Sequence, residues 1–435
     1  MSHCQKSVLF FAFVAVWWGC VCTYAEDALQ KHLTMQEAEK AALANNPRMT
    51  MGMLAALMQN QAIREVRSRE LPQLNANITA VDARGGSRIT AGFLNNPSLY
   101  SRAAVGISAS QLLTDFGRTR NLVRSSQKEE KAREEDAAAI RQALLLAADQ
   151  AFLNALIQQR LLVIAEKTVA DRQTMEDKIE ALTRAKLRST LDQSFAEVQL
   201  SQAELQRMDA ESNAQNALYD LAEIMGTSLQ ANTFLVEEED PLPLPGNSDA
   251  NELVQLAIQA RPDLAALVAQ EQASHLFSKA EHELQRPVIS AMGVVGNTPE
   301  RSVEIVGSWY GAAGVNLNLP VWNGSLFSAR SREAELRDKV AQEQIVQCRN
   351  RIERDVRKTW QSTQAAYQKI AVTNQILEEA NEALRLAEAR YKLGLSSIVE
   401  LSQAQSAQTA AEIDTANARY AYRIWIAELH YQTGQ

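Results

Sequence analysis

The chain has 435 residues, a formal net charge of −8 and 6% aromatic residues. This length allows two or three ordinary domains or one elongated domain, and the acidic balance argues against a nucleic-acid partner. The sequence holds no phosphate-binding glycine loop, nucleophile elbow or other convincing catalytic constellation. We therefore expect neither an enzyme nor a cofactor site.

The first 25 residues are predicted to form a cleaved secretory signal peptide. Lys6 precedes an almost uninterrupted apolar run from Val8 to Trp18, and Thr23 and Ala25 are small residues at the two positions that signal peptidase reads. The alternative is a lipobox at Cys20, which would lipidate the N-terminus, although two tryptophans stand where smaller residues are usual. Either reading predicts an exported protein.

The mature chain is expected to be held together by packing alone. If it begins near Glu26, it keeps only Cys348 and forms no internal disulfide. Cys348 continues an apolar helical stripe, so we expect a buried thiol. The most apolar run after the signal is interrupted by Asp149, Gln150 and Asn154, so we expect no transmembrane helix.

The remainder of the sequence contains an internal duplication. Early landmarks pair at one offset: Pro47 with Pro262 (262 − 47 = 215) and Pro72 with Pro287 (287 − 72 = 215). Later landmarks pair at a smaller one: Gly117 with Gly324 (324 − 117 = 207), Arg188 with Gly394 (394 − 188 = 206) and Gly226 with Gly434 (434 − 226 = 208). A nearly constant offset indicates an internal duplication. We place a first repeat at residues 26–236, a proline-rich acidic linker at 237–250 and a second repeat at 251–435.

Each repeat has the same predicted order of elements. A helix of about 35 residues precedes a strand pair, at about 72–116 or 287–322, and a helix of about 65 to 70 residues follows, then a turn and a helix of about 35. Apolar and small residues recur at alternating steps of three and four from Val356 to Tyr391, which predicts a coiled-coil seam. The fold class is therefore mainly α, internally duplicated, with long coiled-coil helices and four strands.

The strands show a period of two. Residues 74–81, 105–112 and 314–321 alternate apolar and polar side chains, whereas 288–296 alternate poorly. Strands of about eight to ten residues match a tilted membrane strand, and Trp309, Tyr310 and Trp322 stand where interfacial aromatic residues would. A soluble antiparallel sheet with one wet face is the alternative.

Helix lengths suggest how the elements are arranged. At 1.5 Å per residue, a long helix spans roughly 100 Å and a short one roughly 50 Å. If Gly394 supplies a tight turn, the chain reverses there and forms an antiparallel hairpin, with Glu400 in the first turns of the returning helix. Four strands cannot close a barrel, and open edges are not tolerated in lipid, so several copies would have to share one barrel.

One predicted helix carries two histidines that could be considered as metal ligands. His275 and His282 lie seven residues apart on one predicted helix, with Glu271 nearby, but they are better explained as solvated helix residues than as a ligand set. We expect no metal site.

Three segments of the sequence resemble segments of the TolC-like family of outer-membrane efflux proteins. "LTMQEAEKAALANNPRM" resembles its N-terminal helix, "LPVWNGSLFSAR" its entry to the long helix and "RYKLGLSSIVELSQAQ" its tip motif. The resemblance implies a homotrimer in the outer membrane lipid, whose twelve strands form one barrel above a helical tunnel in the periplasm. It also implies a periplasmic membrane-fusion adaptor and an inner-membrane transporter as partners, in drug efflux or type I secretion.

The resemblance also implies roles for residues of the two tip turns. Acidic residues after the turn line the family's entrance; Glu400 and Asp192 match such positions, and Gln403 stands where a second acid can occur. On this resemblance Arg188 stands in place of the family's glycine and Ala185 in place of its usual aromatic residue, and Ser396 stands where a basic residue can occur. The residues expected to form the turns and to dock the adaptor are Arg188, Ser189, Tyr391, Leu393, Gly394, Leu395 and Ser396.

The leading hypothesis is a passive exit duct that partners open and energise. The alternative is a periplasmic coiled-coil adaptor or structural protein. Strand pairs in both repeats argue against an adaptor, which would have a single hairpin.

Overall fold

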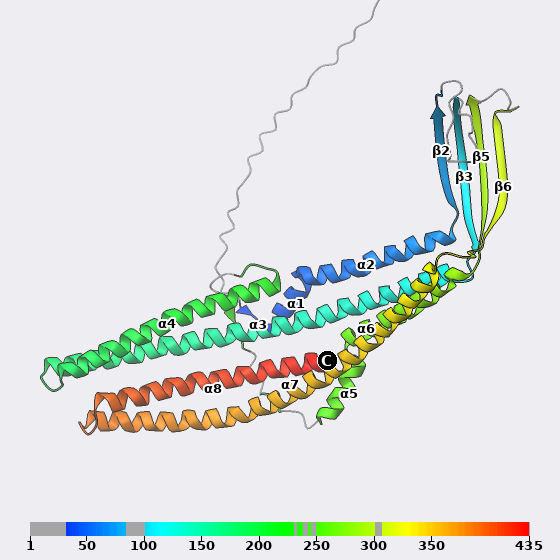
Figure 1. Ribbon diagram of the computed structural model, residues 1–435. Helices are drawn as coiled ribbons and strands as arrows, with labels where there is room; N and C mark the ends of the chain where they lie inside the picture. Colours follow the sequence, from blue (N-terminus) through cyan, green and yellow to red (C-terminus); the bar gives the residue numbers. More distant parts are fainter. Residues whose placement is uncertain are drawn as a thin grey trace, which may run out of the picture.

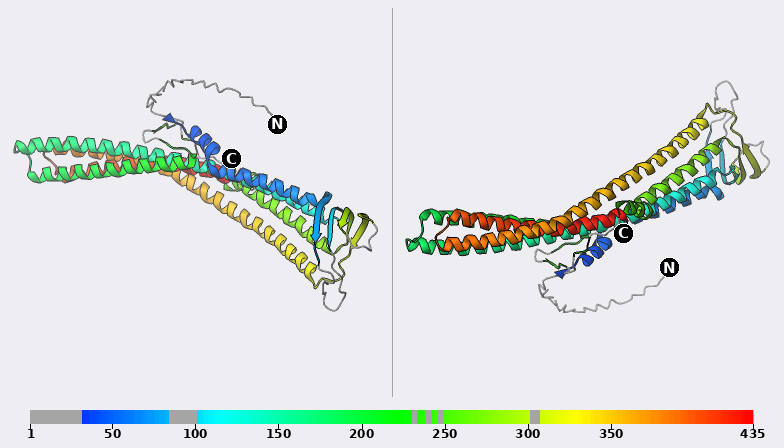
Figure 2. Two further views of the ribbon diagram at one scale, coloured as in Figure 1. Left: turned by 90° about the horizontal axis from the view of Figure 1, so that it is seen from above. Right: turned by 90° about the horizontal axis from the view of Figure 1, so that it is seen from below.

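The computed structural model describes residues 32–83, 101–229, 233–237, 242–244, 249–300 and 307–434. The predicted signal peptide, the Cys20 lipobox and most of the linker lie outside the described residues. The described chain is elongated, with a four-stranded sheet at one end and two helical hairpins reaching the other (Figure 1). Seen from above and below, the hairpins run side by side to their tips (Figure 2).

The helices are the same in number and length in the two halves. Those of the first half are α1 (Met35–Asn45), α2 (Pro47–Arg67), α3 (Arg118–Arg184) and α4 (Thr190–Met225), with 11, 21, 67 and 36 residues. Those of the second half are α5 (Ala250–Ala260), α6 (Pro262–His282), α7 (Leu326–Lys392) and α8 (Ile398–Thr433), again with 11, 21, 67 and 36 residues. Short 3₁₀ turns, Ser68–Glu70 and Glu283–Gln285, lead into the sheet.

One expectation about these helices was wrong. The helix of about 35 residues expected at the start of each repeat is two helices, α1 and α2 or α5 and α6, which meet at Asn46 and Arg261. Both residues have extended backbone and are followed by proline at the first helical position, which has no amide hydrogen to give to a preceding turn.

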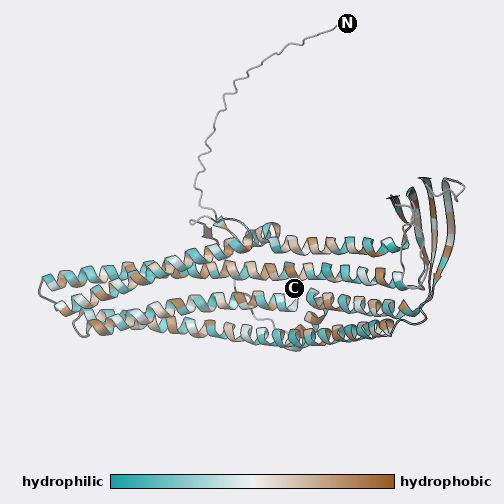
Figure 3. Ribbon diagram, turned by 45° about the horizontal axis from the view of Figure 1, so that its top comes forward, coloured by the Kyte–Doolittle hydropathy of each residue, from teal (hydrophilic) through white to brown (hydrophobic). Residues whose placement is uncertain are grey.

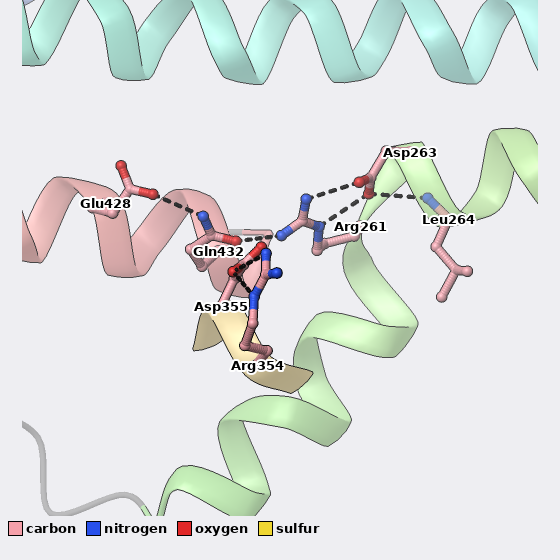
Figure 4. Close-up of polar contacts among 7 residues, drawn as sticks. All are labelled: Arg261, Asp263, Leu264, Arg354, Asp355, Glu428 and Gln432. Atoms are coloured by element: carbon pink, nitrogen blue, oxygen red, sulfur yellow. Dashed lines mark hydrogen bonds and ion pairs between the residues drawn. The ribbon is translucent and has the colours of Figure 1, made fainter. Parts of the chain in front are cut away.

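Each break is bonded to the end of a returning helix. Asn46 accepts from the Arg48 amide at 2.9 Å, and its side-chain nitrogen donates to the Ile224 carbonyl of α4 at 2.8 Å. In the second half, Arg261 donates to both carboxylate oxygens of Asp263, at 3.0 and 2.8 Å, and to Gln432 of α8 (Figure 4). The two joints fix where the helices meet end to end.

Glycines close both joints. Gly226 and Gly434 end α4 and α8 in the left-handed conformation, with φ of +64° and +76°. A Cβ would lie 2.8 Å from the Asn45 carbonyl oxygen at the first and 2.9 Å from the Ala260 Cβ at the second. These glycines are required both for their backbone conformation and for the close approach of the preceding helix.

The element bounds correct the later sequence offsets. The offset between α1 and α5 is 250 − 35 = 215, as expected, but both α3 with α7 (326 − 118) and α4 with α8 (398 − 190) give 208. The drop of seven falls within the strand pair. Gly117 therefore corresponds to Ser325, rather than to Gly324, and both residues have positive φ, +101° and +69°.

The sheet has the order β2-β3-β5-β6, and every neighbouring pair is antiparallel. Its strands are β2 (Gln73–Val81), β3 (Arg102–Thr114), β5 (Val288–Glu300) and β6 (Trp309–Asn318). The fourth strand starts and ends earlier than the predicted 314–321. Two further short strands, β1 (His32–Leu33) and β4 (Phe234–Leu235), pair in parallel beside the helices.

The strand register sorts the side chains onto two faces. One face is apolar and carries Leu74, Ile78, Val105, Ile107, Ile289, Val295, Trp309, Val315 and Leu317. The other is mostly polar and uncharged, and carries Gln73, Asn75, Asn77, Ser108, Ser110, Ser290, Asn316 and Asn318. Met292 and Val294 lie on the polar face, which explains the poor alternation of β5.

Tyr310 does not share the apolar face with Trp309. It pairs with Gly296, which in turn pairs with Gly106 on the polar face. A Cβ added at Gly106 would lie 2.6 Å from the Tyr310 hydroxyl, so the ring lies across the backbone of β3 and β5. The expected grouping of Tyr310 with the interfacial tryptophans was therefore wrong, because neighbouring residues of a strand point to opposite faces.

The helical part is held by small cores between neighbouring helices. Every residue of the predicted seam on α7 is buried or half-buried, and Cys348 is 2% exposed among Val254, Leu264 and Ile352. Burial raises the pKa of the Cys348 thiol. Both the seam and the buried thiol are as predicted.

No helix in the described ranges is long and apolar enough to cross a membrane. Polar residues recur along the helices when the chain is coloured by hydropathy (Figure 3).

Candidate functional site

The second tip turn joins α7 to α8 through Gly394. Its φ is +74°, and the Leu395 amide donates to the Arg390 carbonyl at 2.8 Å, which closes the helix end. Ser397 then caps α8, because its hydroxyl accepts from the Glu400 amide at 3.3 Å. The left-handed glycine and the hairpin are as the sequence predicts.

The first tip turn reproduces this backbone without glycine. Lys186 has φ of +59°, the Leu187 amide donates to the Leu182 carbonyl at 2.8 Å, and Ser189 caps α4 by accepting from the Leu191 amide at 3.1 Å. A left-handed non-glycine residue costs roughly 1 to 2 kcal/mol. The helix ends therefore impose the turn on a residue that disfavours it.

This geometry corrects the pairing of the two turns. Lys186, not Arg188, holds the place of Gly394 (394 − 186 = 208), and Arg188 corresponds to Ser396. Thr183, rather than Ala185, corresponds to Tyr391 (391 − 183 = 208). Because the first turn has no glycine, the pairing read from the sequence was shifted by two residues. The pairing of Asp192 with Glu400 (400 − 192 = 208) is the one expected.

Arg188 and Tyr391 connect the two tips. The Arg188 guanidinium donates to the Tyr391 carbonyl at 2.7 Å and lies 4.2 Å from the centre of its ring. Tyr391 is 6% exposed, and its buried hydroxyl has no hydrogen-bond partner among the described residues. Burial raises the pKa of Tyr391, Arg188 opposes the rise and Asp192 adds to it. Arg188 thus bridges the first hairpin to Tyr391 of the second, and Asp192 lies close enough to influence the same tyrosine.

A small core lies beneath this contact. Ile179 of α3 and Leu401 of α8 are fully buried, together with Ala196, Ala387 and Ile398. All four long elements contribute to it, so the hairpins are packed on each other at the tip. Further along, Arg172 of α3 donates to Gln405 of α8, and burial lowers the pKa of Arg172. Sequence reasoning missed this second bridge, since the two residues are 233 positions apart.

The candidate entrance residues lie at the starts of α4 and α8 and differ in exposure. Glu400 is half-buried and its carboxylate lies 3.4 Å from the Arg390 Nε. Asp192 is half-buried in the first turn of α4, and Gln403 is exposed on α8. Acidic side chains in a first turn are favoured by the helix dipole.

Leucines are exposed at equivalent positions of both tips. Leu187 is 70% exposed and Leu395 is 66% exposed, at an offset of 395 − 187 = 208. Leu393 is also exposed, whereas Ser396 is half-buried. Leu187 was not predicted as a site residue, although the offset of 208 read from Gly226 and Gly434 would have identified it.

His275 and His282 each lie beside another polar side chain. His275 lies 3.1 Å from an Asp338 carboxylate oxygen, and His282 lies 3.4 Å from the Ser331 hydroxyl. Within the described ranges no three metal-binding side chains gather.

Comparisons with known proteins give a consistent result. The profile of the family described as outer membrane efflux protein matches residues 38–227 and 253–435. Outer membrane protein OprJ of Pseudomonas aeruginosa is 26% identical over 387 residues, covering 86% of this chain and 78% of OprJ. Outer membrane protein TolC of Vibrio cholerae is 25% identical over 390 residues, covering 86% of this chain and 84% of that protein. The Campylobacter jejuni CmeC outer membrane channel has a TM-score of 0.79 at 16% identity, covering 92% of this chain and 85% of that one, which shows a shared fold.

The match spans both halves of the chain. It therefore favours a duct over the adaptor alternative, and these relatives are outer membrane and channel proteins rather than enzymes.

Proposed function

Because the chain belongs to the outer membrane efflux protein family, we propose that it acts as a homotrimeric exit duct that conducts substrate passively across the periplasm and the outer membrane. It is an outer-membrane protein that extends into the periplasm. An inner-membrane transporter would supply the energy, and a periplasmic membrane-fusion adaptor would join the two. Tripartite efflux and type I secretion both use this arrangement of parts.

The sheet is the observation that carries this proposal. β2 and β6 lie at its edges, and neither has a partner strand at its outer side among the described residues. One face is apolar and the other is lined with amides and hydroxyls. Unpaired strand edges are too costly in lipid, so the edges must be closed by further copies of the chain. Three copies would give twelve strands, with the polar face around the lumen.

The tips would form the periplasmic entrance. Glu400 and Asp192 lie in the first turns of α8 and α4, and Gln403 lies one turn further on. Repeated around a threefold axis, these side chains would form an acidic ring. The exposed Leu187, Leu393 and Leu395 would dock the adaptor, since exposed apolar groups rimmed by polar ones are typical of docking surfaces.

Efflux of small molecules is the cargo class we favour. Among relatives of similar length, one is named as a cation efflux system protein and another as a pyoverdine export protein. Those names describe the relatives, and the tip of this chain differs from the expected motif at Lys186 and Ser396.

Two neighbouring residues of β6 provide a matched test. Leu317 pairs with Ile289 on the apolar face, and Asn316 pairs with Ser290 on the polar face. Leu317→Arg should reduce the yield of heat-modifiable trimers in outer-membrane fractions, because arginine on the lipid face costs about 2 to 4 kcal/mol at mid-membrane and less towards the interface, near which Leu317 lies at the end of β6. Asn316→Arg should leave assembly intact. Recovery of the wild-type chain solely as a soluble periplasmic protein would refute the proposal.

A further inference from the structure

A recess of about 430 Å³ lies where the sheet meets the helices. Its wall is the polar face of the strands, represented by Gln73, Ser110, Ser290 and Asn318. Its floor is formed by the 3₁₀ turns and by the start of α3. The strand residues of the wall carry no charge, so the electrostatics of the recess are set by the residues of the floor.

Three arginines from three separate elements line this floor. Arg69 comes from the first 3₁₀ turn, Arg118 from the start of α3 and Arg286 follows the second 3₁₀ turn. Arg69 is exposed and has no ion-pair or hydrogen-bond partner within the described residues. The recess therefore contains one cation that nothing in the described protomer neutralises.

Arg118 retains an unused donor. One of its terminal nitrogens lies 3.1 Å from the Glu281 carboxylate, but its Nε is buried and has no acceptor among the described residues. A guanidinium has five N–H donors, and a buried donor without an acceptor costs about 1 to 3 kcal/mol. An oxyanion in the recess would supply the missing acceptor.

The carboxylates at this floor are already engaged. Asp115 caps α3, accepting from the Thr119 amide at 2.7 Å and hydroxyl at 2.5 Å and from the Gly117 amide at 3.2 Å. Glu281 faces Arg118, and Glu283 is paired with Arg286. One oxygen of Glu283 makes no hydrogen bond among the described residues, although it lies beside Arg286. The unused donors of the floor are those of Arg69 and the Arg118 Nε.

We propose that this recess binds an oxyanion, a carboxylate or phosphate group carried by the cargo. The inference rests on the proposed function, because only in the assembled duct does the polar face border the lumen. Guanidinium groups bind such anions through two parallel hydrogen bonds, in a bidentate geometry. Arg69, which is free, would make the first contact, and Arg118 would hold the anion deeper. The duct would then favour acidic or zwitterionic cargo at this point of its path.

Titration of inorganic phosphate into the detergent-solubilised full chain, at constant ionic strength in chloride, tests this site. Arg69→Gln should weaken phosphate binding about tenfold, as expected for the loss of a hydrogen bond to a charged group. Arg64→Gln removes the same charge five residues earlier, outside the recess, and should change binding less than twofold. Arg69 is preferred to Arg118 because replacing Arg118 would leave the buried Glu281 unpaired.

Planar-bilayer recordings separate this inference from the proposed function. Phosphate added to the aqueous phase should reduce wild-type conductance and have less effect on Arg69→Gln. If the source of the anion is instead a lipid headgroup, binding should depend on exchanging phosphatidylcholine for phosphatidylglycerol, and aqueous phosphate should not block. Conductance without phosphate binding, or equal binding by the Arg69 and Arg64 variants, overturns the inference and leaves the duct intact. Absence of conductance contradicts the duct itself.

Discussion

The two hairpin tips have the same backbone and different side chains. Lys186, Arg188 and Asp192 in the first correspond to Gly394, Ser396 and Glu400 in the second, and serine caps the returning helix in both. The equal helix lengths fix the turn, even where lysine must adopt a left-handed conformation. The side chains of the two turns can therefore differ. Arg188 of the first tip contacts Tyr391 of the second, and Ser396, at the equivalent position, is too short to make such a contact.

A second difference lies where the N-terminal helix of each half packs on the long helix. Glu39 and Asp149 face each other between α1 and α3. At the equivalent contact of α5 with α7 stand Val254 (254 − 39 = 215), which is buried, and Arg357 (357 − 149 = 208), which bonds to Glu353. The first half therefore has a carboxyl pair where the second has an apolar contact and an exposed ion pair.

The largest predicted effect concerns Asp149. Burial first, and Glu39 second, raise its pKa to about 8, from 3.8. Between these values the folded chain holds a proton that the unfolded chain has lost, so stability should fall as pH rises, by up to about 1.4 kcal/mol for each pH unit. Asp149→Asn should flatten the profile of unfolding temperature between pH 5 and pH 9.

Arg423 and His430 line the same pocket as Glu39 and Asp149, so a control that removes a carboxylate outside this pocket is needed. Asp171→Asn, which changes an exposed acid of the same helix, should retain the wild-type profile. A steep profile in Asp149→Asn would mean that another group causes the dependence.

Substitutions at the two left-handed positions should have opposite signs. Gly394→Val should destabilise the second tip by at least about 1 kcal/mol, because a β-branched residue is strained at positive φ. Lys186→Gly should stabilise the first tip by about 0.5 to 1 kcal/mol. Unfolding temperatures measure both effects. Export should suffer more than trimer assembly in Gly394→Val; equal losses would give the glycine a role beyond the tip.

Removing the bridge between the tips should loosen the entrance. The contact of Arg188 with Tyr391 combines a hydrogen bond and a cation–π interaction, together on the order of 1 kcal/mol. Arg188→Ala should therefore raise the open fraction in bilayer recordings about fivefold, whereas Ser396→Ala at the equivalent position should not. Identical recordings from the two variants would exclude Arg188 as a latch.

The smallest effect is expected for the acidic ring. Like charges about 7 Å apart in water repel by roughly 0.6 kcal/mol per pair. Glu400→Gln should reduce cation selectivity and weaken block by divalent cations added from the periplasmic side, with trimer yield unchanged. Asp192→Asn should do the same to a lesser degree if Asp192 acts mainly on Tyr391. Unaltered selectivity in both variants would place these acids outside the pore.

The features that could be predicted from the sequence are those determined by residues close together in the chain. The seam up to Tyr391, the turn at Gly394 and three of the four strands follow from periodicity and backbone preference. The register of the first tip was missed because Lys186 carries no sign of its left-handed backbone. The Glu39 and Asp149 pair and the three arginines of the recess were also missed, since they meet only through the packing of elements distant in the chain.

Thiol labelling at two neighbouring positions tests the central claim most directly. Single cysteines at Asn316 and Leu317 would be exposed to a membrane-impermeant maleimide in intact outer membranes, where the native Cys348 is buried. The account predicts labelling of Asn316→Cys through the water-filled lumen and protection of Leu317→Cys by lipid. Equal labelling of both positions would mean that the sheet has two wet faces and does not stand in the membrane.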